Sequence, residues 1–162
     1  MKASVYEGII TSPWGPICLA GTDQGLTRVH FQHDAYLLAT QPSGKTPPAY
    51  FDQAIQQLRE YGAGTRRTFS LPLAPPGTAF QQRVWQALQQ IPYGQTITYQ
   101  DLAVQLGQPT ASRAVGSANG RNPIAIIVPC HRVIGRDGRL RGYAGGLHIK
   151  QQLLQHEGAW PR

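Results

Sequence analysis

Apolar and polar residues alternate along residues 4–31, and turn-forming residues interrupt this alternation twice. The interruptions fall at residues 12–15 and 21–25, which are rich in Gly, Pro, Ser, Thr and Asp. Alternation with such breaks is typical of short strands that bury one face, so we predict a small antiparallel sheet here. A helix should follow over residues 49–61, with one apolar face formed by Phe51, Ile55 and Leu58.

The segment 71–77 has the sequence Leu-Pro-Leu-Ala-Pro-Pro-Gly. Prolines this close together can continue neither a helix nor a central strand, because proline lacks the backbone N–H that both structures use. We therefore predict an N-terminal α/β domain over residues 1–70, a proline-rich linker over 71–77, and a mostly α-helical C-terminal domain over 78–162.

The pattern after the linker predicts a helix-turn-helix. Thr78 can cap a helix that runs to about Ile91, and Thr98 can cap the next helix with an acidic residue three positions later. A Gly-containing turn at residues 107–110 separates this helix from a third, over residues 111–118, which is built from small residues. This outline is typical of a helix-turn-helix, although other helical hairpins share it. The expected inner faces consist of Phe80, Val84, Trp85, Leu88 and Ile91 in the first helix and Leu102, Ala103 and Leu106 in the second.

The end of the chain alternates between apolar runs and loops. Residues 124–129, Ile-Ala-Ile-Ile-Val-Pro, predict a buried run that ends directly at Cys130. Residues 135–146 form a Gly-rich loop with three arginines. A last helix is expected over residues 147–157, with a core face of Leu147, Leu153 and Leu154.

Composition adds an expected partner. Apolar residues make up 41% of the chain and charged residues 14%, which excludes a disordered polyelectrolyte. Residues 78–162 hold nine of the fifteen Lys and Arg residues but three of the eight acidic ones. A positive field concentrated in one domain favours a polyanion such as nucleic acid, although some proteins are basic without such a partner.

The sequence also bears on location. It lacks an apolar signal core near residue 1, and no apolar run approaches the length that spans a membrane. Two cysteines, Cys18 and Cys130, do not suggest a disulfide scaffold. We therefore expect a cytoplasmic protein.

Cys130 is the first candidate for chemistry. A lone cysteine is usually a small buried hydrophobe, and we expect Cys18 to be inert in a strand. Cys130, in contrast, stands in Pro129-Cys130-His131-Arg132, where a base and a cation follow the thiol. Either neighbour would raise the thiolate fraction, so we predict a reactive thiolate. A metal site built from Cys18, His30 and His33 is a weak alternative, because these three do not form a typical ligand pattern.

Four segments then form a recognisable series. RAVGSANGRNP begins at Arg113, and IVPCHRVIG, GYAGG and Lys-x-x-Leu-Leu-x-His-Glu-Gly follow it in order. The series, with Tyr99 before it, resembles the O6-alkylguanine-DNA alkyltransferases, also called methylated-DNA–protein-cysteine methyltransferases. The resemblance covers roughly residues 78–158, and residues 1–70 are similar only in a general way.

The resemblance implies roles for the residues that carry the transfer. Cys130 would accept the alkyl group, and His131 would remove the thiol proton through a water molecule. Glu157 would orient His131, which is the acceptor–base–orienter arrangement of other activated thiols. Asn122 is similar to the family's buried asparagine, which braces the turn near the thiol. Lys150 matches a basic position near the same site.

The resemblance also implies contacts to DNA and to the damaged base. Arg113 would enter the base stack where the damaged base is flipped out, and Tyr99 would turn the 3′ phosphate and contact that base. Tyr143 and the backbone of Val133 would form the guanine pocket. Ala144 stands where some members carry Ser, so a side-chain hydroxyl bond to O6 is absent here.

The implied function is DNA repair by stoichiometric, irreversible transfer of an alkyl group from O6 of guanine, and from O4 of thymine, to Cys130. We expect no cofactor and no metal. The expected partner is double-stranded DNA, bound by a monomer, with cooperative binding left open. A lesion-sensing relative would lack the acceptor cysteine, and a helix-turn-helix transcription regulator would carry several base-reading side chains. A cysteine hydrolase would need an oxyanion hole, which the sequence does not reveal.

Overall fold

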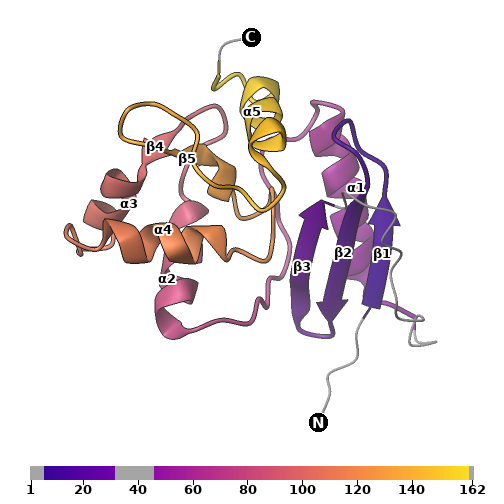
Figure 1. The fold of residues 1–162 in the computed structure, drawn as a ribbon. Coiled ribbons are helices and arrows are strands. Elements are labelled where there is room, and N and C mark those ends of the chain that lie inside the picture. Colours follow the sequence, from indigo (N-terminus) through magenta and orange to yellow (C-terminus); the bar gives the residue numbers. More distant parts are fainter. Residues whose placement is uncertain (1–5, 32–45, 161–162) are drawn as a thin grey trace. The chain divides into compact units, whose positions relative to one another are not determined.

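The computed structural model describes residues 6–31 and 46–160 (Figure 1). The chain divides into two compact units, Met1–Pro76 and Gly77–Arg162. Among the described residues, no helix is long and apolar enough to cross a membrane.

The first unit is a three-stranded antiparallel sheet with one helix. Strands β1 (Tyr6–Ile10), β2 (Ile17–Thr22) and β3 (Gly25–Phe31) lie in the order β1-β2-β3, as the alternating pattern predicts. Helix α1 (Ala49–Gly62) packs its apolar side on the sheet, and the predicted α/β unit is confirmed. Buried core residues include Ile17, Leu19, Leu26, Val29, Phe51, Leu58 and Tyr61.

The proline-rich segment lies along β3. The Leu26 N–H donates to the Pro72 carbonyl at 2.9 Å, and the Ala74 N–H donates to the Leu26 carbonyl at 2.7 Å. Gly25, with a φ of +153°, allows this approach, because a Cβ at that position would lie 2.6 Å from the Pro72 oxygen. Residues around Leu73 thus add a parallel bridge to the first unit.

The second unit is mostly helical, as predicted. Two of its helices begin at reciprocal capping boxes, one between Thr78 and Gln81 and one between Thr98 and Asp101. The first helix ends at Leu88 rather than at Ile91, because the following residues form tighter bonds three residues apart. The elements in order are α2 (Ala79–Leu88), β4 (Ile97–Thr98), α3 (Tyr99–Gln105), α4 (Ser112–Gly120), the short 3-10 helix η1 (Cys130–Arg132), β5 (Val133–Ile134) and α5 (Leu147–His156).

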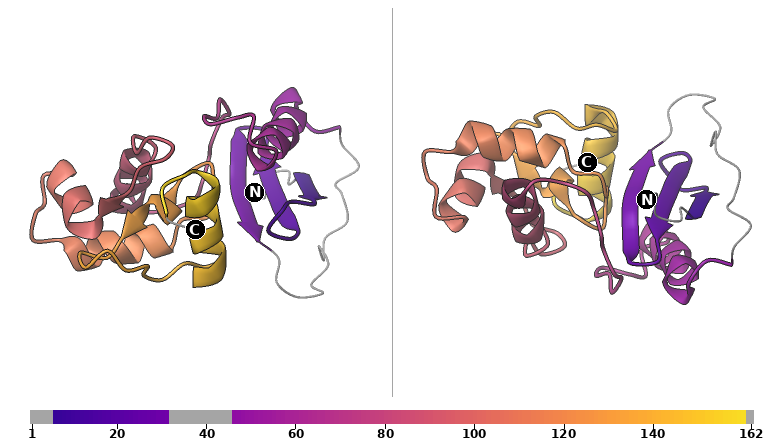
Figure 2. Two further views of the ribbon diagram at one scale, coloured as in Figure 1. Left: turned by 90° about the horizontal axis from the view of Figure 1, so that it is seen from above. Right: turned by 90° about the horizontal axis from the view of Figure 1, so that it is seen from below.

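The second unit places η1 among its helices. Helices α3 and α4 pack together as the expected helix-turn-helix, and Trp85 of α2 donates its indole N–H to the Ala118 carbonyl of α4 at 2.9 Å. Strands β4 and β5 pair in parallel, so the start of α3 is tied to the end of η1. The turn η1 contacts both α2 and α5. Figures 1 and 2 show the helices of this unit from three sides.

The expected core face of α5 is partly wrong. Leu153 and Leu154 are fully buried, but Leu147 is 47% exposed. Ile149 and Lys150 lie on the buried face instead, because they precede Leu153 by one helical turn. Leu147 is the first residue of α5 and lies on its exposed side. The pattern of apolar residues alone does not show whether a leucine at the start of a helix is buried or exposed.

Candidate active site

Cys130 begins the turn η1 at the end of the buried run, and 7% of its surface is exposed. The backbone just before it is strained: Ile126 has a φ of +70°, which is rare for a β-branched residue. The Ile127 N–H donates to the Ala125 carbonyl at 2.8 Å, and the Cys130 N–H to the Val128 carbonyl at 2.8 Å. A backbone outlier held this firmly beside a buried thiol marks a functional site.

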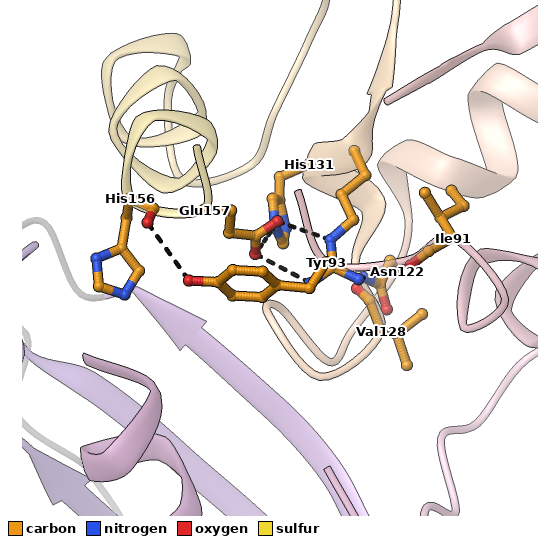
Figure 3. Close-up of polar contacts among 8 residues, drawn as sticks. Ile91, Tyr93, Asn122, Val128, His131, His156 and Glu157 are labelled. Carbon is orange, nitrogen blue, oxygen red and sulfur yellow. Dashed lines mark hydrogen bonds and ion pairs between the residues drawn. The ribbon is translucent and has the colours of Figure 1, made fainter. Parts of the chain in front are cut away.

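The side chain of Asn122 holds this strained loop closed. Its Nδ2 donates to the Val128 carbonyl at 2.7 Å (Figure 3). The same Nδ2 donates to the Ile124 carbonyl at 3.2 Å, and Oδ1 accepts the Ile124 N–H at 3.0 Å. Asn122 thus satisfies three backbone groups of a loop that forms no regular ladder. Burial raises the pKa of the Cys130 thiol, and a hydrogen bond with the Asn122 side chain opposes part of this rise.

His131, the second residue of η1, is fully buried and pairs with the carboxylate that ends α5. Its Nε2 lies 2.8 Å from Oε2 of Glu157 (Figure 3). Burial alone would raise the pKa of Glu157, but the hydrogen bonds from His131 and Arg132 and the charge of Arg132 outweigh it and hold that pKa well below its usual range. An ionised carboxylate can only accept, so Nε2 carries the proton and Nδ1 presents a lone pair.

The free nitrogen of His131 is available as a base. Burial lowers the pKa of His131, although Glu157 opposes this shift, so the ring is neutral at physiological pH. Within the described part of the chain, the buried Nδ1 has no hydrogen-bond partner. A neutral imidazole with a free lone pair can accept a proton, and the adjacent carboxylate would then stabilise the cation.

The prediction that Cys130 is a thiolate at rest does not agree with the burial of its sulfur. Burial raises the pKa of Cys130, and the opposing effects of Asn122 and the Lys150 charge are smaller. The resting sulfur is therefore a thiol, and it needs a base when it reacts. The sequence motif identifies the neighbours correctly but contains no information on how deeply the sulfur is buried.

Lys150 is buried completely, unlike most lysines. Its Nζ donates to the Val133 carbonyl at 2.7 Å and to the Arg141 carbonyl at 2.9 Å, and it lies 5.9 Å from the centre of the Tyr99 ring. Burial lowers the pKa of Lys150 to about 8, while the charge of Cys130 opposes this shift. Lys150 therefore joins β5 to the loop before α5, and Val133 contributes a carbonyl to this junction.

A cavity of about 610 Å³ opens between α3, α4 and the loop before α5. Tyr99, Arg113, Tyr143 and Ala144 line it, together with the predicted loop arginine Arg141. Glycines of α4 also line the cavity and leave room near the Tyr99 ring. Burial raises the pKa values of Tyr143 and Tyr99, and a negative charge at Cys130 would raise them further.

The structure brings the expected residues together in two layers. Tyr99, Arg113, Tyr143 and Ala144 line the cavity. The others lie in the adjoining interior, namely Cys130, His131, Glu157, Asn122, Val133 and Lys150. Arg113 is exposed on α4, as contact with an external ligand requires.

Sequence reasoning missed two buried polar residues in this region. Asn119 of α4 donates Nδ2 to the Cys130 carbonyl at 3.4 Å, and Arg132 binds Glu157 with its guanidinium. Arg132 stands beside the Cys-His pair, and that adjacency was the available signal. Its partner lies 25 residues away, which no local pattern reveals.

The alternative metal site has no support in the described residues. Cys18 and His30 face each other across β2 and β3, while His33 lies outside the described residues. No group of three or more His, Cys, Asp or Glu side chains in the described ranges could hold a metal ion.

Comparison with known proteins matches both units. Residues 79–159 match the model for the 6-O-methylguanine DNA methyltransferase DNA-binding domain, and residues 5–75 match the model for the ribonuclease-like domain of the same proteins. The chain is 52% identical over 155 residues to a methylated-DNA–protein-cysteine methyltransferase of Methanosarcina acetivorans, covering 96% of this chain and 99% of that protein. It is 51% identical over 156 residues to the protein of the same name from Mycobacterium tuberculosis, covering 94% and 92%.

Solved structures show the same arrangement. The crystal structure of the Mycobacterium tuberculosis O6-methylguanine methyltransferase superposes with a TM-score of 0.84 at 46% identity, covering 98% of this chain and 95% of that one. The Mycobacterium tuberculosis protein in complex with DNA gives the same TM-score at 47% identity, covering 95% and 93%.

Proposed function

The chain belongs to the 6-O-methylguanine DNA methyltransferase family and is a methylated-DNA–protein-cysteine methyltransferase, and on this premise we propose that Cys130 is the residue that takes the alkyl group. The protein binds DNA and repairs O6-methylguanine in it. We propose further that it acts once per molecule, on O6-alkylguanine and on O4-alkylthymine in double-stranded DNA.

One observation carries the assignment of Cys130. It directly precedes a neutral, buried histidine that is paired with an ionised carboxylate, and a negative charge on its sulfur would act on Tyr99 and Tyr143, which line the cavity. Cys18, the other cysteine, is buried in strand β2 of the first unit, whereas the cavity and the histidine–carboxylate pair belong to the second unit. The base and the cavity together favour Cys130 as the nucleophile.

The transfer is a displacement at carbon. The thiol proton passes to Nδ1 of His131 through a water molecule, and Glu157 stabilises the imidazolium that forms. The sulfur then bonds to the alkyl carbon as the bond from that carbon to O6 breaks, and the electron pair stays with guanine. A hydroxyl of Tyr99 or Tyr143, kept protonated because burial raises the pKa, donates a proton to the departing base. The proton taken up by His131 then replaces the one that the tyrosine gave, so that in net terms the thiol proton ends on guanine.

The electron and proton balance of this step is complete without a cofactor. The products are a thioether on Cys130 and an intact guanine, and the transferred carbon is neither oxidised nor reduced. A thioether is a poor leaving group, so the protein is not regenerated. An acceptor cysteine must stay reduced before it reacts, which suits the cytoplasm.

DNA contact follows from the surface of α4. Arg113 is exposed among small residues, so the helix can approach the duplex closely and the arginine can replace the flipped base. One copy of the second unit contains every residue of the proposed site, which is consistent with action as a monomer.

A mass spectrum after reaction tests the proposal. We expect the intact protein to gain one methyl group when mixed with duplex DNA that contains O6-methylguanine, and the modified peptide to contain Cys130. The amount repaired should reach a plateau at the amount of protein added. A protein that binds the lesion with unchanged mass would be a sensor, and a yield far above one per molecule would exclude the single-turnover mechanism.

We expect Arg113→Ala to slow repair of duplex DNA much more than reaction with free O6-benzylguanine. The arginine offsets the cost of unstacking a base, which is a few kcal/mol, and a free base requires no unstacking. Single-turnover rates on the two substrates measure the difference, with Arg83→Ala in α2, another exposed arginine of the same unit, as the matched control. Equal losses on both substrates would argue against insertion of Arg113 into the stack.

A further inference from the structure

Arg132 is the last residue of η1, and 6% of its surface is exposed. Its Nε donates to Oε1 of Glu157 at 2.8 Å and its Nη2 donates to Oε2 at 3.0 Å, so the two side chains meet through two nearly parallel bonds. The third contact runs from Nη1 to the Ile91 carbonyl at 2.7 Å, just after α2. The guanidinium also lies 5.7 Å from the centre of the Tyr93 ring.

These contacts determine the orientation of the Glu157 carboxylate. Two parallel bonds to a planar guanidinium fix both the plane of the carboxylate and its rotation. A cation that binds at a single point, such as a lysine ammonium, would fix neither. In that orientation Oε2 also accepts from Nε2 of His131 at 2.8 Å. The histidine and the arginine therefore share one carboxylate oxygen, and the arginine also binds the other.

We infer that Arg132 is a positioning residue of the transfer reaction, which fixes ionised Glu157 so that it accepts the Nε2–H of His131 and leaves Nδ1 free as the base. The inference rests on the proposed function, because it assigns the task of a base to His131. It also gives a reason for a buried cation in a region where cations are costly.

The need for such a residue follows from the chemistry of imidazole. A neutral imidazole can carry its proton on either ring nitrogen, and the partner of one nitrogen decides which form is present. If Glu157 rotated away or took up a proton, Nδ1 could become the protonated nitrogen and could no longer accept the thiol proton. Arg132 prevents both changes, because it binds the two carboxylate oxygens and favours their ionised form.

The charged groups around His131 give the direction of the pH effect. Glu157 raises the pKa of His131, while burial and the positive charges of Arg132 and Lys150 lower it; Tyr143 faces Glu157 and Cys130. Removing the charge of Arg132 removes one of the lowering effects, so the pKa of His131 should rise. The base would then stay protonated up to a higher pH, so the acid limb of the rate profile should move to higher pH.

Two variants and a control test the inference. We expect Arg132→Met to reduce the single-turnover rate by about tenfold or more at neutral pH, a smaller loss than the roughly hundredfold or more attributed to a general base, because His131 itself remains. The acid limb of the rate profile should move to higher pH. The ¹⁵N spectra of the unreacted protein should show a mixture of the two neutral ring forms of His131, one with the proton on Nδ1 and one with the proton on Nε2. Arg132→Lys should restore the position of the acid limb but leave the mixture of ring forms, because it keeps the charge and loses the fork. Arg59→Met in α1, an exposed arginine, should leave all three readouts unchanged.

The readouts separate positioning from a structural role. Rates are taken per folded molecule, so a variant that only weakens the fold keeps the wild-type pH profile and a proton-free Nδ1, which would overturn the inference. If Arg132→Met does not fold, the same result in Arg132→Lys would overturn it. Absence of a mass gain on Cys130 in the wild-type protein would instead refute the proposed function, while the ¹⁵N spectra would still show whether Arg132 controls the ring form.

Discussion

Replacing Cys130 with serine is expected to abolish alkyl transfer and to leave binding of lesion-containing duplex DNA largely intact. A serine hydroxyl occupies nearly the same space, but its oxygen is much less acidic than a thiol and a poorer nucleophile at saturated carbon. The exposed Arg113 and the other residues that line the cavity are unchanged, so the DNA-binding surface should persist. Mass spectrometry measures the transfer, and fluorescence anisotropy with labelled duplex measures binding.

Cys18→Ser is the matched control for this experiment. Cys18 is buried in β2, where burial raises its pKa, and it should remain unreacted in the wild-type protein. The control should therefore take up one alkyl group at the wild-type rate per folded molecule. Transfer by Cys130→Ser, or a modified peptide that contains Cys18, would be incompatible with Cys130 as the acceptor.

Glu157→Gln should cause the largest loss of stability among single changes at the site. The substitution removes the negative charge that compensates buried Arg132, and breaking a buried ion pair typically costs about 3–5 kcal/mol of unfolding free energy. Transfer should also slow by about a hundredfold or more per folded molecule, because a general base contributes about that much and His131 would lose its orienting anion. Urea denaturation measures the first effect and single-turnover rates the second.

The dependence on pH distinguishes this effect from a packing defect. The pKa of Glu157 in the folded protein lies below its ordinary value of 4.5, so its contribution to stability is complete above that pH. The contribution is lost as the pH falls toward the folded pKa, so wild type and Glu157→Gln should converge in acid. A constant difference at all pH values would indicate that the ion pair is not the cause.

The surface pair of Glu60 and Arg66 offers the matched control. Their contact distance is 2.7 Å, similar to that of the buried pair, but both side chains are about one third exposed. Glu60→Gln should change the unfolding free energy by less than about 1 kcal/mol, because water screens an exposed pair. If the two substitutions had equal effects, burial would not be what makes the Glu157 contact strong.

Local features of this fold were predictable, and contacts between distant residues were not. The helix starts at Thr78 and Thr98 depend on residues three positions apart, and the meander depends on alternation within one segment. The orientation of Leu147 depends on how α5 docks, which a short helix does not encode. The sequence similarly predicts that Gly25 lies in a turn. Its close approach to Pro72 becomes visible only in the folded structure.

The site shows the same division. The motif around Cys130 pointed to Cys130, His131 and Glu157 through a family resemblance, and the structure places His131 in contact with Glu157. It did not reveal that Lys150 is fully buried, because a lysine in a polar helix pattern is normally solvated. It did not reveal the positive φ of Ile126 or the bond from Arg132 to Ile91 either, because both depend on packing around residues far apart in the chain.

The position of Glu157 in the chain has a consequence for biosynthesis. Glu157 lies 26 residues after His131 and directly follows α5, so the ribosome adds it long after the Cys-His pair. Domains fold as their segments emerge, and η1 cannot acquire its carboxylate until α5 has left the ribosome and docked. A nascent chain that has reached Cys130 therefore carries an ordinary thiol beside an unoriented imidazole. On the proposed roles of these residues, we expect the thiol to become competent for transfer only when the end of α5 has been made and folded.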